Sequence, residues 1–179
     1  MFYVSDSRTD SPKSYKTLLQ QEIYRLLAYL DITFERVESD EAIAMEDCIF
    51  IEKKLNMKMV KTLFLCNRQQ TEFFLFITRG DKAFSSRKFS MALETARVSF
   101  APEEKMEKML GTGIGAATVF SAFLDKENKV KIIIDEEVAA EQWYGCSDGT
   151  TTGYIKIKTK LILECFLPAV KHPPVIIKI

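Results

Sequence analysis

The sequence is poor in the residues from which most metal and catalytic sites are built. It contains a single histidine, His172, and four cysteines with no CxxC pair among them. Zinc sites need several Cys or His ligands at close spacing, so the scattered Cys48, Cys66, Cys146 and Cys165 are expected to be reduced, structural thiols. We therefore expect no metal ion and no other cofactor. His172, next to a proline, is expected to be a surface or packing residue.

Long apolar runs and familiar active-site motifs are also missing. No apolar stretch reaches the ~18 residues of a membrane span, and the first residues, MFYVSDSRTDSPKSYK, do not resemble a secretory signal. We thus predict a soluble, cytoplasmic protein with no membrane partner. No GxSxG, HExxH or P-loop pattern occurs. The length and composition fit one globular domain, which we place at 15–179 after a flexible lead-in at 1–14.

Overall charge is zero, but the basic residues gather in the middle of the chain. Between residues 53 and 97, ten Lys and Arg stand against three Asp and Glu, a net charge of +7, while residues 1–52 carry −6 and 98–179 carry −1. Such a stretch permits local contact with a polyanion without the general affinity of a strongly basic domain. A solvated surface explains the same pattern, so both interpretations stay open.

Hydrophobic periodicity predicts helices and hairpins that do not follow a regular βαβ order. We therefore predict a mixed α/β fold, with a mixed or antiparallel sheet surrounded by helices. In the helix expected over residues 45–56 the periodic apolar residues are Met45, Ile49 and Leu55. The expected helices cover residues 14–32, 45–56, 88–97, 102–110, 136–144 and 160–170. The expected strands cover 33–38, 154–159 and 174–179, one hairpin with arms 60–66 and 71–78, and a second with arms 116–123 and 129–135.

Three glycines, Gly111, Gly113 and Gly115, follow one of these helices. A dinucleotide-binding fingerprint needs a strand, then glycines, then a helix, whereas the predicted order here is helix, glycines, strand, which argues against it. Gly111 is expected to end the helix. The other two glycines either form a flexible connection or let a ligand approach the backbone and its N–H donors.

The charged residues suggest no strong general base. The acidic pairs Glu103–Glu104 and Glu136–Glu137 stand at expected helix starts, where they favour the helix dipole. Lys61 opens the first hairpin arm, a place where a lysine usually points to solvent. Its functional alternative is contact with an anionic ligand or a polarised carbonyl.

Seven short segments stand out when they are taken together: KTLFLCN (61–67), GDK (80–82), RVSFAPEE (97–104), LGTGIGAATVF (110–120), DKENKV (125–130), WYGC (143–146) and IKIKT (155–159). In this order they resemble the YbaK-like aminoacyl-tRNA editing family, and most closely its free-standing prolyl-tRNA editing branch (ProX and PrdX). The resemblance runs from about Tyr15 to the end of the chain and implies a single domain on a curved sheet. It also implies an enzyme, a trans-editing deacylase that hydrolyses alanine wrongly attached to proline tRNA. The implied partners are the aminoacyl-tRNA acceptor end and prolyl-tRNA synthetase.

The resemblance also assigns site residues. The family's functional lysine corresponds to Lys61, and its pocket loop, close to PGSVTP, corresponds to residues 114–119. Lys61, Gly115 and Ala116 are thereby expected to be catalytic, with the lysine holding the ribose or terminal phosphate and the loop backbone facing the scissile carbonyl. The expected substrate-binding residues are Ala117, Thr118, Val119, Ser147 and Thr151.

The chain departs from the family pattern at several positions. Ser147 and Thr151 stand where a histidine and an asparagine are common, Ser39 and Ala44 where a histidine and a threonine are common, and both prolines of the pocket loop are absent. An aminoacyl ester is already activated, so positioning and backbone oxyanion donors, worth about 10²–10³-fold each, can suffice. Three interpretations stay open: a deacylase, acting on alanyl, seryl or another small acyl group; a tRNA- or synthetase-binding protein of the same fold without turnover; and hydrolysis of another small ester.

Overall fold

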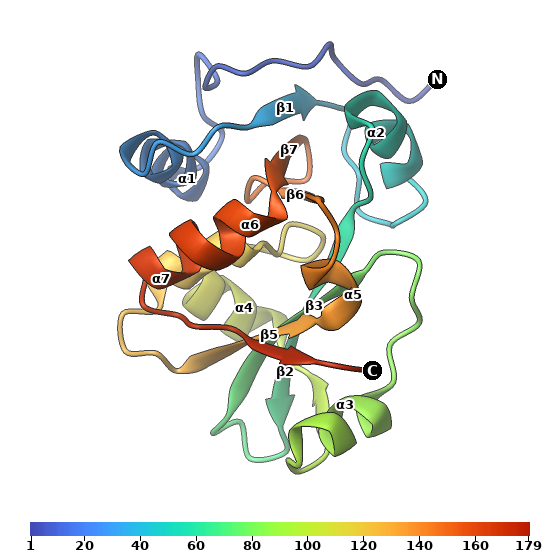
Figure 1. The fold of residues 1–179 in the computed structure, drawn as a ribbon, viewed down its shortest axis with the longest axis vertical. Helices are drawn as coiled ribbons and strands as arrows, with labels where there is room; N and C mark the ends of the chain where they lie inside the picture. The colour runs from blue at the N-terminus through green and yellow to red at the C-terminus, as the bar shows by residue number, and fades with distance from the viewer.

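Two β-sheets form the frame of the molecule. In the computed structural model, which describes residues 1–179, the larger sheet has the strand order β4-β2-β3-β5-β8 and the smaller one the order β1-β7-β6 (Figure 1). The strands are β1 (Glu35–Glu38), β2 (Val60–Asn67), β3 (Phe73–Arg79), β4 (Val98–Phe100), β5 (Val130–Asp135), β6 (Trp143–Ser147), β7 (Gly153–Lys158) and β8 (Val175–Ile177). The helices are α1 (Leu18–Tyr29), α2 (Cys48–Leu55), α3 (Ser86–Leu93), α4 (Glu103–Leu110), α5 (Glu136–Ala139), α6 (Thr159–Leu161) and α7 (Leu167–Ala169), with a 3₁₀-helix η1 (Val119–Leu124) and a π-helix η2 (Ile162–Phe166).

The β2–β3 hairpin is the centre of the larger sheet and was predicted correctly. Its strands pair antiparallel, and the Asn67 side chain fixes the turn by accepting hydrogen bonds from the amides of Thr71 (2.9 Å) and Glu72 (3.1 Å). β3 is buried on both faces, as its continuous apolar sequence predicted, with Phe74 and Leu75 in different core clusters. β5 lies parallel to β3, which makes the sheet mixed.

The second hairpin was predicted wrongly. Residues 119–124 form η1, because Thr118 caps the helix by accepting a hydrogen bond from the Phe120 amide, while Val119 and Phe120 enter the core. β5 instead pairs in parallel with β3 and β8. A short apolar run fits a buried strand and a buried helical turn equally well, so its periodicity could not separate the two.

Smaller differences concern three expected helices. In α2 the buried residues are Cys48, Ile51 and Leu55, and Ile49 is 47% exposed, so the predicted face was wrong at that residue. The helix expected over 136–144 ends at Ala139, and its last two residues belong to β6. The C-terminal helix continues one residue past Pro168. A π-turn precedes this proline and loosens the backbone pattern that a proline would otherwise interrupt.

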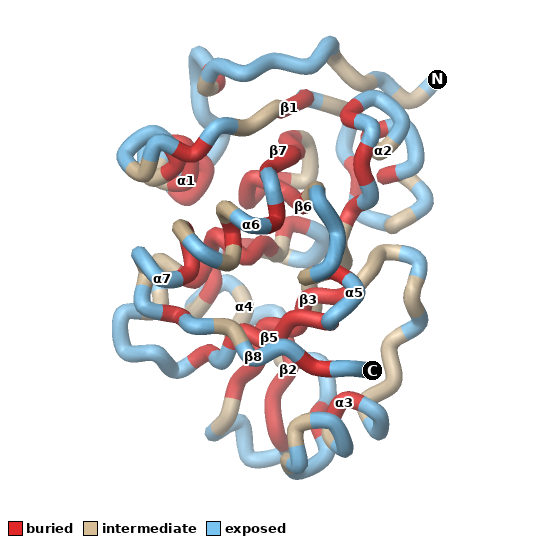
Figure 2. Tube along the Cα trace, in the orientation of Figure 1, coloured by how far each residue is buried: buried red, intermediate tan, exposed pale blue.

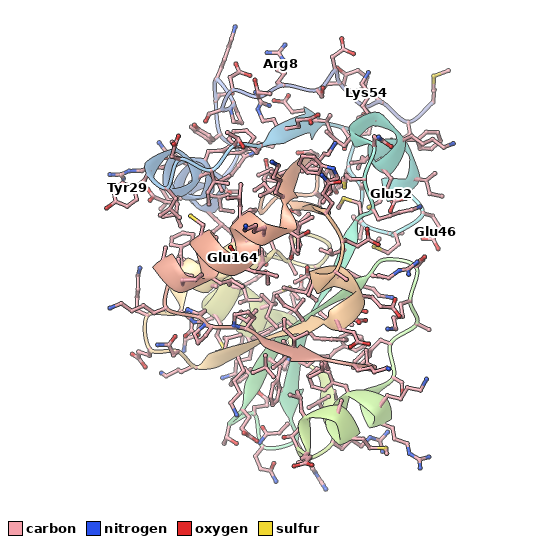
Figure 3. The ribbon with its side chains drawn as sticks, viewed as in Figure 1. Arg8, Tyr29, Glu46, Glu52, Lys54 and Glu164 are labelled. Carbon is pink, nitrogen blue, oxygen red and sulfur yellow. The ribbon has the colours of Figure 1, made fainter.

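The N-terminal segment, expected to be a flexible lead-in, runs along the outer edge of β1. Arg8 and Arg36 exchange backbone hydrogen bonds of 2.9 and 2.8 Å, and the Ser5 amide donates to Glu38. Lys54 of α2 reaches the same segment through an ion pair of 2.7 Å to Asp6 (Figure 3). The boundary at residue 14 stays a prediction.

One β-bridge joins the two sheets. A parallel bridge joins Met59, just before β2, to Gly145 of β6. The largest core cluster, with 25 buried residues, packs α1 and the C-terminal helices against strands of both sheets, and Figure 2 shows burial concentrated along β2, β3, β5 and the β6–β7 pair. No helix is both long and apolar enough to cross a membrane. The junction of the sheets is where the candidate site lies.

Candidate active site

An apolar cavity of about 500 Å³ opens beside the junction of the two sheets. Six chain segments contribute to its walls: the loop before α2, the first half of β2, the β4–α4 connection, the glycine loop after α4, β6 and β7. Of its twenty lining residues, fifteen are hydrophobic, so the few polar groups it contains decide what chemistry it can support. The one carboxylate among them is Glu103, at the start of α4.

The first polar feature is an uncovered stretch of strand edge. β4 pairs with β2 only from residue 65 onward, and the Ala101 amide donates to the Phe64 carbonyl at 2.9 Å. Backbone groups of alternate residues point to the same side of a strand, so the N–H and C=O of Thr62 face that side as well. No strand lies beside Thr62 there, which leaves its N–H and C=O available at the cavity wall.

The second feature is Lys61, which the sequence singled out. Its ammonium group donates a hydrogen bond to the main-chain carbonyl of Lys82 and forms no ion pair with any carboxylate. Lys82 is itself held by Asp135, with Nζ 2.8 Å from Oδ2, and the Thr78 hydroxyl donates to the same oxygen at 2.7 Å. Burial alone would raise the pKa of Asp135, but the Lys82 ammonium and the Thr78 hydroxyl outweigh it and hold that pKa below its usual value. Lys61, on β2, therefore has no ion-pair partner, and its ammonium group is held by the carbonyl of a firmly anchored loop.

The third feature is the glycine loop. Gly111 ends α4 with φ +68°, as predicted, and Gly115 has φ +84°. A side chain at Gly115 would place its Cβ 3.3 Å from the Cα of Ile43, on the opposing loop. The Ala116 amide donates to the Gly113 carbonyl (3.3 Å), whereas the amides of Gly115 and Ala117 donate to no protein acceptor. Two free N–H donors thus lie two residues apart in the cavity wall.

Four of the eight predicted site residues line this cavity: Lys61, Gly115, Ala117 and Ser147. Ser147 lies in the wall, but its hydroxyl is used within a turn, donating to the Thr150 carbonyl (2.6 Å) and accepting from the Gly149 amide (3.0 Å). Its side chain therefore offers the cavity no free donor.

The other four predicted residues lie outside the lining. Ala116 is a buried residue of the loop itself, Thr118 caps η1, and Val119 is a fully buried core residue. The Thr151 hydroxyl donates to Glu41 at 3.0 Å, which ties the β6–β7 turn to the loop before α2. None of these four side chains belongs to the cavity lining.

Sequence reasoning missed most of the apolar wall. Ile43, Phe100 and Ile114 are 57%, 62% and 61% exposed although they border the cavity, and Met45 and Met106 lie deeper. Each is an ordinary apolar residue in its own segment, so only the fold shows that they converge.

Two cysteines in the wall are unsuited to nucleophilic attack. Burial, assisted by the neighbouring Glu52, raises the pKa of Cys48 to about 11. Burial also raises the pKa of Cys146 to about 12. Both are neutral thiols near pH 7, and all four cysteines are unpaired, as expected.

Comparisons with known proteins agree with this architecture. Among curated proteins, the prolyl-tRNA editing protein ProX of Acetoanaerobium sticklandii is 23% identical over 119 residues, which cover 66% of this chain and 73% of that protein. A crystal structure of the hypothetical protein APE2540 superposes with a TM-score of 0.68 at 11% identity, covering 88% of this chain and 98% of the other. A candidate trans-editing enzyme for prolyl-tRNA synthetase superposes with a TM-score of 0.66 at 12% identity, covering 92% and 99%.

These structures share the mixed α/β fold, which confirms the predicted fold class. The family model for the aminoacyl-tRNA editing domain matches residues 50–165, a range that contains β2, the glycine loop, β6 and β7. The resemblance stated from the sequence motifs is therefore confirmed: the chain belongs to the family of aminoacyl-tRNA editing domains.

Proposed function

We propose that this protein hydrolyses mischarged aminoacyl-tRNA in trans, with alanine on proline tRNA as its preferred substrate. One observation carries the proposal: an apolar cavity holds an uncompensated ammonium group, Lys61, together with two free backbone donors, at Gly115 and Ala117. That combination suits a neutral ester with an anionic phosphate at one end. The name of the ProX relative points to the same substrate class.

The proposed chemistry needs no charged base. Water adds to the ester carbonyl, and the amides of Gly115 and Ala117 stabilise the oxyanion that forms; one such donor contributes about 10²–10³-fold in rate. The bond to the ribose oxygen then breaks, and the proton lost by the attacking water ends on that oxygen, with the neighbouring ribose hydroxyl able to assist. Lys61 holds the ribose or terminal phosphate and so fixes the ester against the loop.

Selectivity follows from size. A synthetic site for a larger amino acid discriminates against a smaller one by only about 1–3 kcal/mol per missing methylene, and a second, smaller site corrects the resulting error. In this chain the Ala117 side chain and the opposing Ile43 limit the space beside the two free amides. Alanine fits this sieve better than proline.

The test is deacylation of alanyl-, seryl- and cysteinyl-tRNA, each carried on proline tRNA, with correctly charged prolyl-tRNA as the matched control. We expect alanyl-tRNA to be hydrolysed fastest and prolyl-tRNA to be spared. Failure to hydrolyse any of the three mischarged substrates would rule the proposal out.

A second function has one observation in its favour. The hydroxyls of Ser147 and Thr151, which stand where the family often has histidine and asparagine, are both occupied by contacts within the protein. A protein that binds tRNA or a synthetase without turnover fits this loss of free polar groups. Measurable tRNA binding without hydrolysis in the same assay would select this function.

A further inference from the structure

The cavity has an aromatic residue at its rim. Phe100, at the end of β4, lines the cavity yet is 62% exposed, and its ring packs against Phe84 with centroids 5.7 Å apart and planes at 60°. Phe84 in turn contacts Phe76 and Phe89 in the core. Phe100 is therefore held in place from behind while much of its surface stays open, which is the arrangement that unpaired nucleic-acid bases use for stacking.

Arginines that form no ion pair lie beyond the other end of β4. In the β2–β4 ladder Val98 pairs with Asn67, so Arg97 and Arg68 are the first residues beyond the end of the ladder on the two chain segments. Arg97 also lines a shallow groove with Arg87 of α3, beside three hydroxyl side chains and one acid, Glu94. Both features place basic side chains at the end of β4 that lies away from the cavity.

Six of the ten cations in the basic stretch form no ion pair, and these three arginines are among them. Arg68, Arg87 and Arg97 are exposed and form no ion pair. The paired cations of the same stretch are Lys54, Lys58, Arg79 and Lys82, each of which contacts an Asp or Glu. The positive charge that the sequence placed in its middle segment is thus left unneutralised mainly around β4 and α3.

The spacing between Arg97 and Phe100 suits a short single-stranded RNA. Arg97 lies three residues before Phe100, about 10 Å along the chain at ~3.3 Å per residue. This length matches about three stacked nucleotides at ~3.4 Å each. An RNA strand whose last base stacks on Phe100 would therefore place the phosphates of the nucleotides two or three positions before that base near Arg97 and Arg68.

Acidic residues lie near other parts of the cavity. α4 begins at the rim with Glu103 and Glu104. Glu46 lies on the loop before α2 (Figure 3). A polyanion approaching the cavity is repelled near these residues and attracted along β4.

We propose that β4 and α3 guide the single-stranded 3′ end of the RNA into the cavity, with Phe100 stacking on a terminal base and Arg68, Arg87 and Arg97 contacting backbone phosphates. The partner is the unpaired CCA end of a tRNA. The assignment to aminoacyl-tRNA rests on the proposed function, whereas the RNA-binding surface itself can be tested without turnover.

The binding test uses a short fluorescein-labelled single-stranded RNA ending in CCA, with anisotropy measured over a range of KCl concentrations. Each of Arg68→Gln, Arg87→Gln and Arg97→Gln should reduce the slope of log affinity against log salt by about 0.7, the value for one phosphate contact to a single strand. Phe100→Ala should weaken binding about tenfold, within the range for loss of one base–aromatic stack, with little change in slope. Lys13→Gln, an exposed and unpaired cation of the N-terminal segment, is the control and should change neither quantity.

A kinetic test separates this surface from the hydrolytic site. On full-length alanyl-tRNA the three arginine variants should raise KM at unchanged kcat, and on 3′-alanyl-adenosine, which lacks the preceding nucleotides, they should match the wild type. An arginine triple variant with unaltered salt slope and KM would overturn the inference while leaving hydrolysis in place. Absent hydrolysis with arginine-dependent RNA binding would instead reject the proposed function alone.

Phe100→Leu keeps apolar packing against Phe84, and it should weaken binding as Phe100→Ala does. Wild-type affinity in Phe100→Leu would remove Phe100 from the proposed RNA-binding surface.

Discussion

The ammonium group of Lys61 donates its hydrogen bond to the main-chain carbonyl of Lys82, and the Lys82 side chain is fixed in turn by the buried Asp135. The position of the proposed substrate-binding lysine thus depends on a carboxylate on another strand. The GDK segment (residues 80–82), one of the motifs that carried the family resemblance, contains Lys82 and so links Lys61 to Asp135.

Asp135→Asn should therefore weaken both stability and activity. We expect the free energy of unfolding to fall by about 1.5–3 kcal/mol, since Lys82 and Thr78 lose their hydrogen bonds to a charged carboxylate. We also expect KM to rise because the loop that holds Lys61 loosens. Urea unfolding and deacylation kinetics measure the two effects. Asp81→Asn, which removes an exposed ion pair to Arg79, is the control and should cost less than about 1 kcal/mol.

The same carboxylate predicts a pH dependence. The pKa of Asp135 is lower in the folded state than in the unfolded chain, so its contribution is fully present above the ordinary Asp range and is lost as pH falls through the folded-state value. The stability difference between wild type and Asp135→Asn should hence shrink in acid. A difference that stays constant down to low pH would contradict this role.

Gly115→Ala should lower kcat by at least about tenfold. The substitution puts a side chain at φ +84° and within 3.3 Å of the Ile43 Cα, so the loop must move and its two free amides with it. Gly113→Ala is the matched control, because its Cβ would meet only a Glu103 oxygen at 3.9 Å. Equal kcat in both variants would remove the loop from the mechanism.

Cys48→Ala should keep activity within a few-fold of wild type. Its thiol lines the cavity, but with a pKa of about 11 it is neutral near pH 7 and cannot act as the nucleophile. Detection of an acyl group bound to the wild-type protein by mass spectrometry, absent in Cys48→Ala, would show that the chemistry is covalent after all.

The single histidine supports the fold and lies away from the cavity. His172 is buried, as a packing role predicts, with Nδ1 2.8 Å from the Val170 carbonyl and Nε2 2.9 Å from Asp125. Burial alone would raise the pKa of Asp125, but the hydrogen bonds from His172 and two backbone amides outweigh it and hold that pKa below its usual range. Asp125→Asn should destabilise the protein by about 1–3 kcal/mol at neutral pH and by less in acid, with deacylation kinetics unchanged. The exposed Glu127→Gln is its control.

Local signals in the sequence were sufficient for much of the fold. The β2–β3 hairpin has two apolar arms and a polar turn, and α4 has Pro102 before it and Gly111 after it, so chain-local chemistry determined both. Residues 116–123 were misassigned because their apolar residues fit a buried strand as well as a 3₁₀-helix, and tertiary packing selected the helix.

The candidate site was predictable only in part. Lys61 and Gly115 belong to recognisable motifs, and both line the cavity. The Ala116 amide, expected to face the substrate, is consumed by the Gly113 carbonyl, a detail of turn geometry that no residue pattern encodes. The proposed stacking surface at Phe100 and the placement of Arg68 and Arg97 beyond the end of the ladder depend on strand register, which emerges only once β4 is placed beside β2.

The most direct test of the account is the rate of alanine release from alanyl-tRNA(Pro) by the wild type, by Lys61→Ala and by Lys58→Ala, a nearby lysine that is exposed and paired with Glu52. We predict rapid hydrolysis by the wild type and by Lys58→Ala, and a loss of at least about tenfold in kcat/KM for Lys61→Ala. Equal rates for all three proteins, or no hydrolysis by any of them, would contradict the account.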